Sequence, residues 1–269
     1  MGWSDWLLQN EMQVRLICFV SLFALMASWE VLKPCRPLVY SRVLRWSNNL
    51  ALVALNTLLL RLLFPAAAVG LAHVAHSQGW GVFALLELPH LFEVILAVIL
   101  LDLLIYFQHV IFHKVPILWR LHRVHHADPD YDLTTGIRFH PIEIILSMLI
   151  KFAAIILLGP AAVAVLIFEV LLNGSAVFNH SNVRLPARVD RVVRFVFVTP
   201  DMHRVHHSWI RSETDSNYGF ALSIWDRLFS TYQDQPQKGH LKMDIGLEDL
   251  QDVKEVSWLT GILKLPFRR

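Results

Sequence analysis

The sequence of 269 residues is poor in cysteine and in charge, and it contains no G-x-G-x-x-G nucleotide-binding motif. Only Cys18 and Cys35 are present, which excludes a disulfide scaffold. Charged residues make up 17% of the chain, against about 25% in an average soluble domain. The net charge of +2 gives no reason to expect a nucleic-acid partner. With 55% hydrophobic residues, the composition excludes a disordered chain and disfavours an ordinary soluble enzyme.

Long apolar runs are the main feature of the first two thirds of the chain. Five segments are long enough to cross a hydrocarbon core of about 30 Å, or nearly so: 14–32, 50–72, 90–112, 142–158 and 161–178. The last two could form a full transmembrane pair or a shallower re-entrant hairpin. Lys151 in the fourth segment favours a tilted or partly hydrated helix. No A-x-A-like cleavage site follows the first segment, so we interpret it as a retained span and not as a signal peptide.

The distribution of basic residues predicts the orientation of these spans. Segments 33–47 and 114–140 are rich in Lys and Arg, whereas 73–89 contains neither. The positive-inside rule therefore places 33–47, 114–140 and 179–269 on the cytoplasmic side, with the N-terminus and 73–89 outside. We expect an all-α integral membrane protein with four or five transmembrane helices. A cytoplasmic helical cap should hold a histidine-rich site that binds two metals.

Histidines carry most of the functional information. The third apolar segment ends in H-x-x-x-H (109–113), and H-x-x-H-H occurs twice, at 122–126 and 203–207. Positions i, i+3 and i+4 share one helix face. The histidine content predicts roughly 0.04 occurrences of H-x-x-H-H in such a chain, so two occurrences point to function. Neutral imidazole binds zinc, copper, iron and nickel, and this many histidines suit two ions with three to five nitrogen ligands each.

Several motifs around these histidines carry a family resemblance. They include Arg-Leu-His-Arg-Val-His-His (120–126), Thr-Gly-Ile-Arg-Phe-His-Pro (135–141), Phe-Asn-His-Ser-Asn-Val (178–183) and Glu-Thr-Asp-Ser-Asn-Tyr-Gly-Phe (213–220). Over about residues 95–235 the chain resembles the fatty acid hydroxylase/sterol desaturase superfamily, in particular its bacterial sterol-desaturase-like branch. These are integral-membrane non-haem di-iron oxygenases. The resemblance implies O₂-dependent hydroxylation or desaturation of an unactivated C–H bond in a sterol-like, fatty acyl or ether lipid.

The resemblance also implies a ligand set and a division of the chain. N-terminal transmembrane helices (1–94) would precede the catalytic domain (95–235) and a cytoplasmic C-terminal tail (236–269). His140 is a candidate tenth ligand, although a helix-capping or supporting role is an equal alternative. Two iron ions are expected, and zinc would accept the same ligands. The implied ligands are His109, His113, His122, His125, His126, His180, His203, His206 and His207, with His140 as the possible addition.

Four further residues are candidates for a direct catalytic role. Asp102 lies in the third span, where an acidic side chain is a functional hypothesis by default. It could accept a hydrogen bond from a ligand imidazole or from Tyr106, or it could pair with Arg61 of the second span. Asn217 and Tyr218 form a turn with the following glycine, and only the family pattern implies that they line the site.

The absence of cofactor-binding motifs indicates what electron donor the protein would need. Without a nucleotide, haem or flavin motif in the sequence, the electrons should come from a separate donor, namely a ferredoxin or ferredoxin reductase in a bacterium, or cytochrome b5 in a eukaryote. The expected location is the bacterial inner membrane, or the endoplasmic reticulum of a eukaryote.

Four other functions compete with that of an oxygenase. A zinc-dependent membrane lipid hydrolase is one, but H-E-x-x-H is absent from the sequence. A metal transporter would place its ligands near the middle of several spans. A haem-b protein needs facing histidines on separate spans, and a metal-free scaffold does not explain the histidine motifs.

Overall fold

The computed structural model describes residues 2–268 and consists of helices joined by short loops. The N-terminal half contains α1 (Trp3–Gln9), α2 (Glu11–Leu32), α3 (Arg42–Leu63), α4 (Ala67–Ser77), η1 (Val82–Leu85), α5 (His90–Lys114), α6 (Pro116–His126) and η2 (Thr135–Ile137). The C-terminal half contains α7 (Pro141–Leu158), α8 (Ala162–Asn179), α9 (Ala187–Val193), α10 (Pro200–His206), α11 (Arg211–Thr214), α12 (Ile224–Leu228), α13 (Gly239–Lys242), α14 (Val253–Ser257), α15 (Leu259–Lys264) and η3 (Leu265–Phe267).

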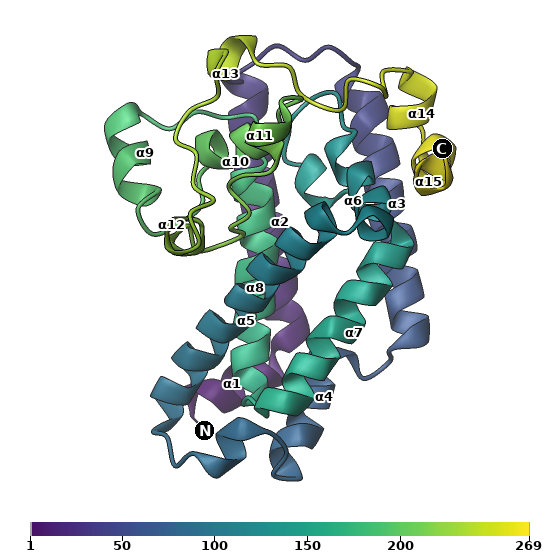
Figure 1. The fold of residues 1–269 in the computed structure, drawn as a ribbon. Helices are drawn as coiled ribbons and strands as arrows, with labels where there is room; N and C mark the ends of the chain where they lie inside the picture. The colour runs from purple at the N-terminus through teal and green to yellow at the C-terminus, as the bar shows by residue number, and fades with distance from the viewer. Residues whose placement is uncertain (1, 269) are drawn as a thin grey trace.

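The long helices form one bundle with two distinct ends (Figure 1). Within residues 2–268, five helical segments are long and apolar enough to cross a membrane: Glu11–Leu32, Arg42–Leu85, His90–Lys114, Pro141–Leu158 and Ala162–Asn179. The N-terminus, α4 and η1 lie at one end, and α6 and α9–α15 gather at the other. The prediction of an all-α integral membrane protein is confirmed. The three segments predicted to share one side do lie at one end, and the side of the membrane that this end faces stays a prediction.

The fourth and fifth segments form a full pair of helices. α7 and α8 have 18 residues each, or about 27 Å at 1.5 Å per residue. The turn between them contacts the loop that follows α4, because a Cβ on Gly159 would lie 1.8 Å from the carbonyl oxygen of Trp80. Gly159 also has a φ of +65°, which favours glycine. The pair therefore reaches from the histidine end of the bundle to the N-terminal end, and the re-entrant alternative is not adopted.

The second predicted span, 50–72, is interrupted. α3 ends at Leu63 and α4 begins at Ala67, because Pro65 lacks an amide hydrogen and disfavours helical geometry at Phe64. α4 packs against α7 and α8, and the main apolar core lies where α4, α5, α7 and α8 meet.

Lys151, which suggested a tilted or partly hydrated helix, is paired with an acidic residue inside the bundle. Its ammonium group lies 2.5 Å from Glu169 of α8, which also pairs with Arg15 of α2 at 2.6 Å. Lys151 and Glu169 are both buried. A buried charge is tolerated when it is paired, so this triad joins three of the spanning helices.

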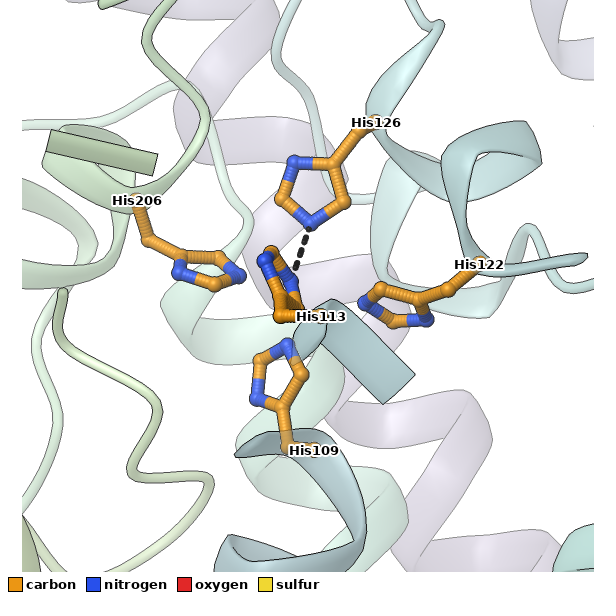
Figure 2. A group of neighbouring side chains, drawn as sticks. All are labelled: His109, His113, His122, His126 and His206. Atoms are coloured by element: carbon orange, nitrogen blue, oxygen red, sulfur yellow. Dashed lines mark hydrogen bonds between the residues drawn. The ribbon is translucent and has the colours of Figure 1, made fainter. Parts of the chain in front are cut away.

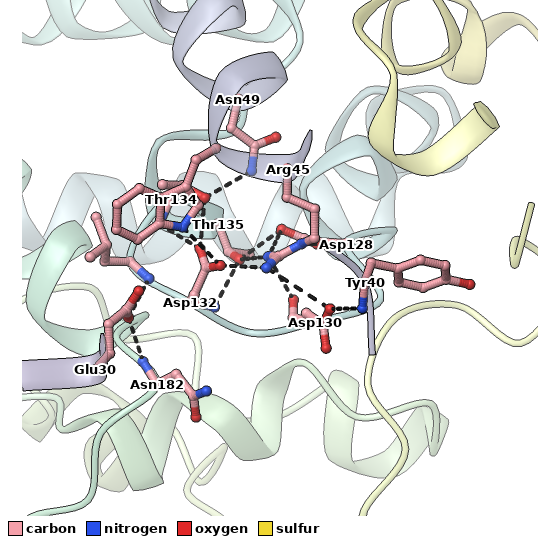
Figure 3. Close-up of polar contacts among 12 residues, drawn as sticks. Glu30, Tyr40, Arg45, Asn49, Asp128, Asp130, Asp132, Thr134, Thr135 and Asn182 are labelled. Atoms are coloured by element: carbon pink, nitrogen blue, oxygen red, sulfur yellow. Dashed lines mark hydrogen bonds and ion pairs between the residues drawn. The ribbon is translucent and has the colours of Figure 1, made fainter. Parts of the chain in front are cut away.

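Arg45 connects α3 to the loop between α6 and η2 (Figure 3). Arg45 belongs to the basic segment 33–47, and it lies in α3 with no exposed surface. Its guanidinium donates to both carboxylate oxygens of Asp128, each at 2.8 Å, and to Asp132. Burial opposes ionisation of Asp128, but Arg45 outweighs this effect and holds its pKa below the usual value. Asp130 instead accepts from the backbone of Val39 and Tyr40 at the end of the preceding loop.

Candidate metal centre

Four elements bring the histidine motifs together at one end of the bundle. The H-x-x-x-H motif ends α5, and the first H-x-x-H-H motif occupies the last turns of α6 directly after it. The second H-x-x-H-H motif lies at the end of α10, where the Thr199 side chain caps the helix and Pro200 occupies its first turn. His180 follows the last residue of α8. Each motif therefore reaches the site from a helix terminus.

The first group contains five histidines whose rings converge (Figure 2). One candidate ligand atom from each of them lies within 4.8 Å of every other. The Nε2 atoms of His113 and His126 are 3.1 Å apart. All five are buried, and they are His109, His113, His122, His126 and His206. We call this set the five-histidine group.

The second group contains four buried histidines: His125, His180, His203 and His207. The Nε2 atom of His180 lies 3.1 Å from that of His125 and 3.0 Å from that of His203. For a metal–nitrogen distance of about 2.1 Å, neighbouring ligands of one ion lie roughly 3.0–3.4 Å apart. The spacing within this four-histidine group fits ligation of a single ion.

Unpartnered nitrogens indicate where metals would bind. In the five-histidine group, Nδ1 of His109 donates to the carbonyl of Tyr218 at 2.8 Å, and Nδ1 of His206 to that of Ser216 at 2.7 Å. These bonds leave Nε2 of both rings with its lone pair, buried and without a hydrogen-bond partner among residues 2–268. A buried polar atom left unpaired costs about 1–3 kcal/mol. A metal ion at the centre of the group would satisfy them.

The histidines outside the spanning helices are poised in their neutral form. Burial lowers the pKa of His122 and of His180 to about 3. Burial, and then repulsion by neighbouring imidazoles, lowers the pKa of the remaining histidines on α6 and α10 well below the usual value; these are His125, His126, His203, His206 and His207. Neutral imidazole is the form that binds metals.

A sequence profile of the fatty acid hydroxylase family matches residues 94–231, about half of the chain. The chain belongs to this family. The family resemblance inferred from the motifs is thereby confirmed.

Relatives within this family act on lipids, as their names state. The chain is 30% identical to the ornithine lipid hydroxylase OlsE of Rhizobium tropici over 188 residues, which cover 68% of this chain and 54% of the relative. It is 29% identical to human alkylglycerol monooxygenase over 138 residues, 49% of this chain and 29% of the relative. The zebrafish (Danio rerio) alkylglycerol monooxygenase is 30% identical over 171 residues, 61% of this chain and 36% of the relative. The chain thus spans about half the length of the first relative and about a third of the others. No solved structure matches the chain.

Each H-x-x-H-H motif of this fatty acid hydroxylase family member is divided between the two groups. On α6, His122 and His126 belong to the five-histidine group and His125 to the four-histidine group. On α10, His206 belongs to the former, whereas His203 and His207 belong to the latter. The sequence pattern predicted convergence but did not predict this division.

Two carboxylates next to the five-histidine group were missed by sequence reasoning. Glu143, in the first turn of α7, accepts from Nδ1 of His122 at 2.6 Å and is buried. Asp215 lies 3.4 Å from Nδ1 of His113. Such carboxylates orient a ligand histidine and raise its basicity. An acidic residue within an apolar segment was the available signal for Glu143, and it is the same signal that singled out Asp102.

Aromatic rings contact both groups, and two of these rings stack on histidines of the four-histidine group. Phe139 stacks on His125 with ring centroids 4.6 Å apart and an interplanar angle of 10°. Tyr131 stacks on His180 at 5.7 Å, and its hydroxyl donates to the carbonyl of Asn179 at 2.5 Å. Packing is the contact that orients His125, whose Nδ1 has no hydrogen-bond partner among residues 2–268.

His140 is not brought into either group. It is the N-cap residue of α7, and its Nδ1 accepts from the backbone amide of Ile142 at 3.2 Å. Its Nε2 lies 3.3 Å from the carbonyl of Leu263. The helix-capping alternative describes its position, so we remove His140 from the ligand set.

Asp102 and Tyr106 support the cap and do not contact the ligands. Asp102 accepts from the indole of Trp225 at 2.8 Å and from two backbone amides of the preceding loop. Asp102 does not pair with an imidazole, with Tyr106 or with Arg61. The partners expected from the sequence are replaced by Ala221, Leu222 and Trp225. The hydroxyl of Tyr106 lies 2.8 Å from that of Thr231.

Asn217 shapes a loop, whereas Tyr218 lies beside the five-histidine group. Asn217 has a φ of +49°, and its side chain bonds to the backbone of Met202 and Gln233, so it shapes the loop. The ring of Tyr218 lies 5.1 Å from that of His113. Burial raises the pKa of the Tyr218 phenol, which therefore stays protonated beside the five-histidine group.

Proposed function

We propose that this protein is a membrane-bound non-haem di-iron oxygenase that hydroxylates or desaturates a C–H bond of a lipid. The observation that carries the proposal is the division of nine buried histidines into a group of five and a group of four at one end of the membrane helices. Membership of the fatty acid hydroxylase family and similarity to proteins named as lipid hydroxylases support it.

The donor set fits two iron ions, one in each group. All the proposed ligands are imidazole nitrogens, which suit iron as well as zinc. When bound, a pair of reduced irons supplies the two-metal activation of O₂ that such a C–H oxidation requires. We propose His109, His113, His122, His126 and His206 for one ion and His125, His180, His203 and His207 for the other.

The chain's own residues position the ligands and shield the centre from water. Backbone carbonyls of Ser216 and Tyr218 fix the Nδ1 protons of two ligands, so that Nε2 faces inward. Glu143 and Asp215 hold two more from outside. Because the groups are buried, water has little access to a reactive centre. We propose Tyr218 as the phenol nearest to the chemistry, and we assign Asp102, Tyr106 and Asn217 to positioning of the cap.

The remaining proposals concern the membrane in which the protein lies and its electron donor. We propose that the histidine end faces the cytoplasm of a bacterium, in its inner membrane, or of a eukaryote, at the endoplasmic reticulum. Two electrons per turnover would come from outside these 269 residues, through a ferredoxin, its reductase or cytochrome b5. The zinc hydrolase alternative needs a carboxylate free to act as general base. Glu143 is already held by Nδ1 of His122, and Asp215 pairs with Lys114 and Arg211.

Metal analysis of the detergent-purified protein tests the proposal. About two irons per chain are expected, together with a lipid product that gains ¹⁸O from ¹⁸O₂ or loses two hydrogens. A His125→Ala/His206→Ala variant, which removes one ligand from each group, should lose at least one of the two irons and all of the product. His73→Ala/His76→Ala is the matched control, because both residues are exposed and far from the groups in sequence. Zinc that persists after growth in iron-rich, zinc-poor medium, without O₂-dependent activity, would favour the hydrolase.

A further inference from the structure

An apolar cavity of about 420 Å³ lies between α2, α8 and the segment that follows α9. Its walls include Phe19 and Leu22 of α2 and Gly174 of α8. The cavity opens toward the lipid-facing surface, because Leu171 and Phe197 on its rim are 46% and 51% exposed. Its volume falls in the range of about 300–1,000 Å³ that is typical of ligand pockets.

One end of the cavity is formed by residues that lie close in the chain to two histidines of the candidate metal centre. Phe178 lines the cavity two residues before His180, and Val198 lines it five residues before His203. Both of these ligands belong to the four-histidine group, which has fewer nitrogen ligands and therefore more open positions for reactants.

The opposite end of the cavity is marked by charge. Arg15 lines it there and pairs with Glu169 at 2.6 Å. Along α8 the lining residues run from Val170 to Phe178, a rise of about 12 Å. The cavity therefore extends along the spanning helices, away from the histidine end and toward the middle of the bundle.

A buried polar group stands at the junction of cavity and centre. Asn179 has no exposed surface, and its Nδ2 donates to the carbonyl of Phe220 at 2.8 Å. Phe220 precedes Ala221, which lines the cavity. The Oδ1 atom of Asn179 has no hydrogen-bond partner among residues 2–268.

We propose that this cavity holds the hydrocarbon chain of the lipid substrate, with the polar end of the lipid toward the histidine groups and the chain directed toward Arg15. The inference rests on the proposed function. This direction is the one that a lipid takes in the adjoining leaflet, with its polar group near the membrane surface and its tail toward the midplane. Carbon atoms close to the polar end therefore face the metal centre, and the far end of the chain does not.

Photo-crosslinking in nanodiscs tests both the site and its direction. The probes are two hexadecylglycerol ethers, one with a diazirine in mid-chain and one with a diazirine beside the glycerol. The mid-chain probe is expected to label peptides that contain Phe19 and Gly174, and the other probe peptides that contain Asn179 or Ala221. Labelling in the reverse order, or scattered over lipid-facing helices, overturns the proposal.

A cavity-filling variant provides the second arm of the experiment. Gly174→Leu should reduce labelling of the cavity at least fivefold, whereas Leu157→Trp adds bulk on a lipid-facing surface of α7 and should leave it unchanged. Gly174→Ala is the folding control, since its new Cβ would lie an ordinary 3.4 Å from Leu22. Unchanged labelling in Gly174→Leu overturns the proposal.

Labelling needs neither metal nor turnover. Specific labelling without O₂-dependent activity would therefore reject the oxygenase and retain the lipid site. O₂-dependent activity with scattered labelling would retain the oxygenase and reject the lipid site.

Discussion

The two histidine groups share the histidines of the α6 and α10 motifs but are held in different ways. In the five-histidine group, hydrogen bonds hold the Nδ1 atoms of His109, His122 and His206, and the acceptor for His122 is the carboxylate of Glu143. The carboxylate of Asp215 lies 3.4 Å from Nδ1 of His113. In the four-histidine group only His180 has such a bond, to the carbonyl of Ala176 at 2.9 Å. In that group, the rings of Phe139 and Tyr131 stack on His125 and His180 and help to orient them. An ion in the five-histidine group would therefore have a rigid, electron-rich ligand shell. An ion in the four-histidine group would have open positions beside the apolar cavity.

Removing a ligand should have the largest effect and should differ between the groups. His203→Ala leaves three histidines in the four-histidine group, so we expect loss of about one metal per chain and of all activity. His206→Ala leaves four ligands and two supporting carboxylates, so metal content should stay near two, with weaker retention against a chelator. Metal analysis during chelator titration measures both. Equal losses in the two variants would contradict the asymmetry.

Breaking the charge network behind the α6–η2 loop should have the next largest effect. Arg45→Met leaves Asp128 and Asp132 buried without their cation, which costs about 3–5 kcal/mol of stability. A fall in the thermal midpoint of the detergent-solubilised protein would show this. Arg42→Met, on the same helix, removes only a contact with Trp46 at 5.9 Å and should cost under about 1 kcal/mol. Similar midpoints for both variants would show that the network is not needed.

Acidification should affect both groups alike. The pKa of His122 and of His180 is about 3 in the folded protein, against about 6.5 when unfolded. As pH falls below 6.5 the unfolded chain binds protons first, so stability of the metal-free protein falls until about pH 3. Each such histidine removes about 2 kcal/mol between pH 6.5 and 5. Thermal midpoints between pH 7.5 and 5 test this, and His122→Asn and His180→Asn should each flatten the dependence.

Removing a supporting carboxylate should weaken only the five-histidine group. Glu143→Gln keeps a hydrogen-bond acceptor for His122 but removes the charge, and loss of such support typically lowers metal affinity about 10–100-fold. Competition with a chromophoric chelator should show one weakened ion out of two. Asp215→Asn should have a smaller effect, because its contact with His113 is 3.4 Å and Asp215 also pairs with Lys114 and Arg211. Weakening of both ions by Glu143→Gln would show that the groups are not separable.

The smallest effect is expected from the aromatic support of the four-histidine group. Phe139→Leu removes the ring stacked on His125, a contact worth about 0.5–1.5 kcal/mol. Affinity for the ion of the four-histidine group should fall about 2–10-fold. The other ion should be affected less, because the ring of Phe139 lies farther from that of His122, at 6.2 Å. The same chelator competition measures it. An effect as large as that of Glu143→Gln would mean that stacking orients a ligand as firmly as a carboxylate.

Much of the architecture was accessible from the sequence because its signals are local. Hydropathy marks the spans, and the spacing of histidines marks a helix face whatever the rest of the chain does. The break in the second span was also local, at Pro65, and was overlooked because the flanking residues are apolar.

The remaining features depend on contacts between distant parts of the chain. Asp102 binds cap residues that lie 119–123 positions later, and no pattern within α5 indicates such partners. Arg45 reaches Asp128 across 83 positions. Likewise, the angle between α6 and α10 decides which histidine joins which group. These are tertiary contacts that local periodicity cannot encode.

The sharing of α6 and α10 between the two groups has a mechanical consequence. His125 and His126 are successive residues that serve different groups, as are His206 and His207, and successive Cα atoms are fixed about 3.8 Å apart. The two motifs thus fix the spacing between the groups through the backbone, and the separation of two bound ions would depend on this covalent geometry. A bend in either helix would displace ligands of both ions at once, so the pair should open, close or fail as one unit.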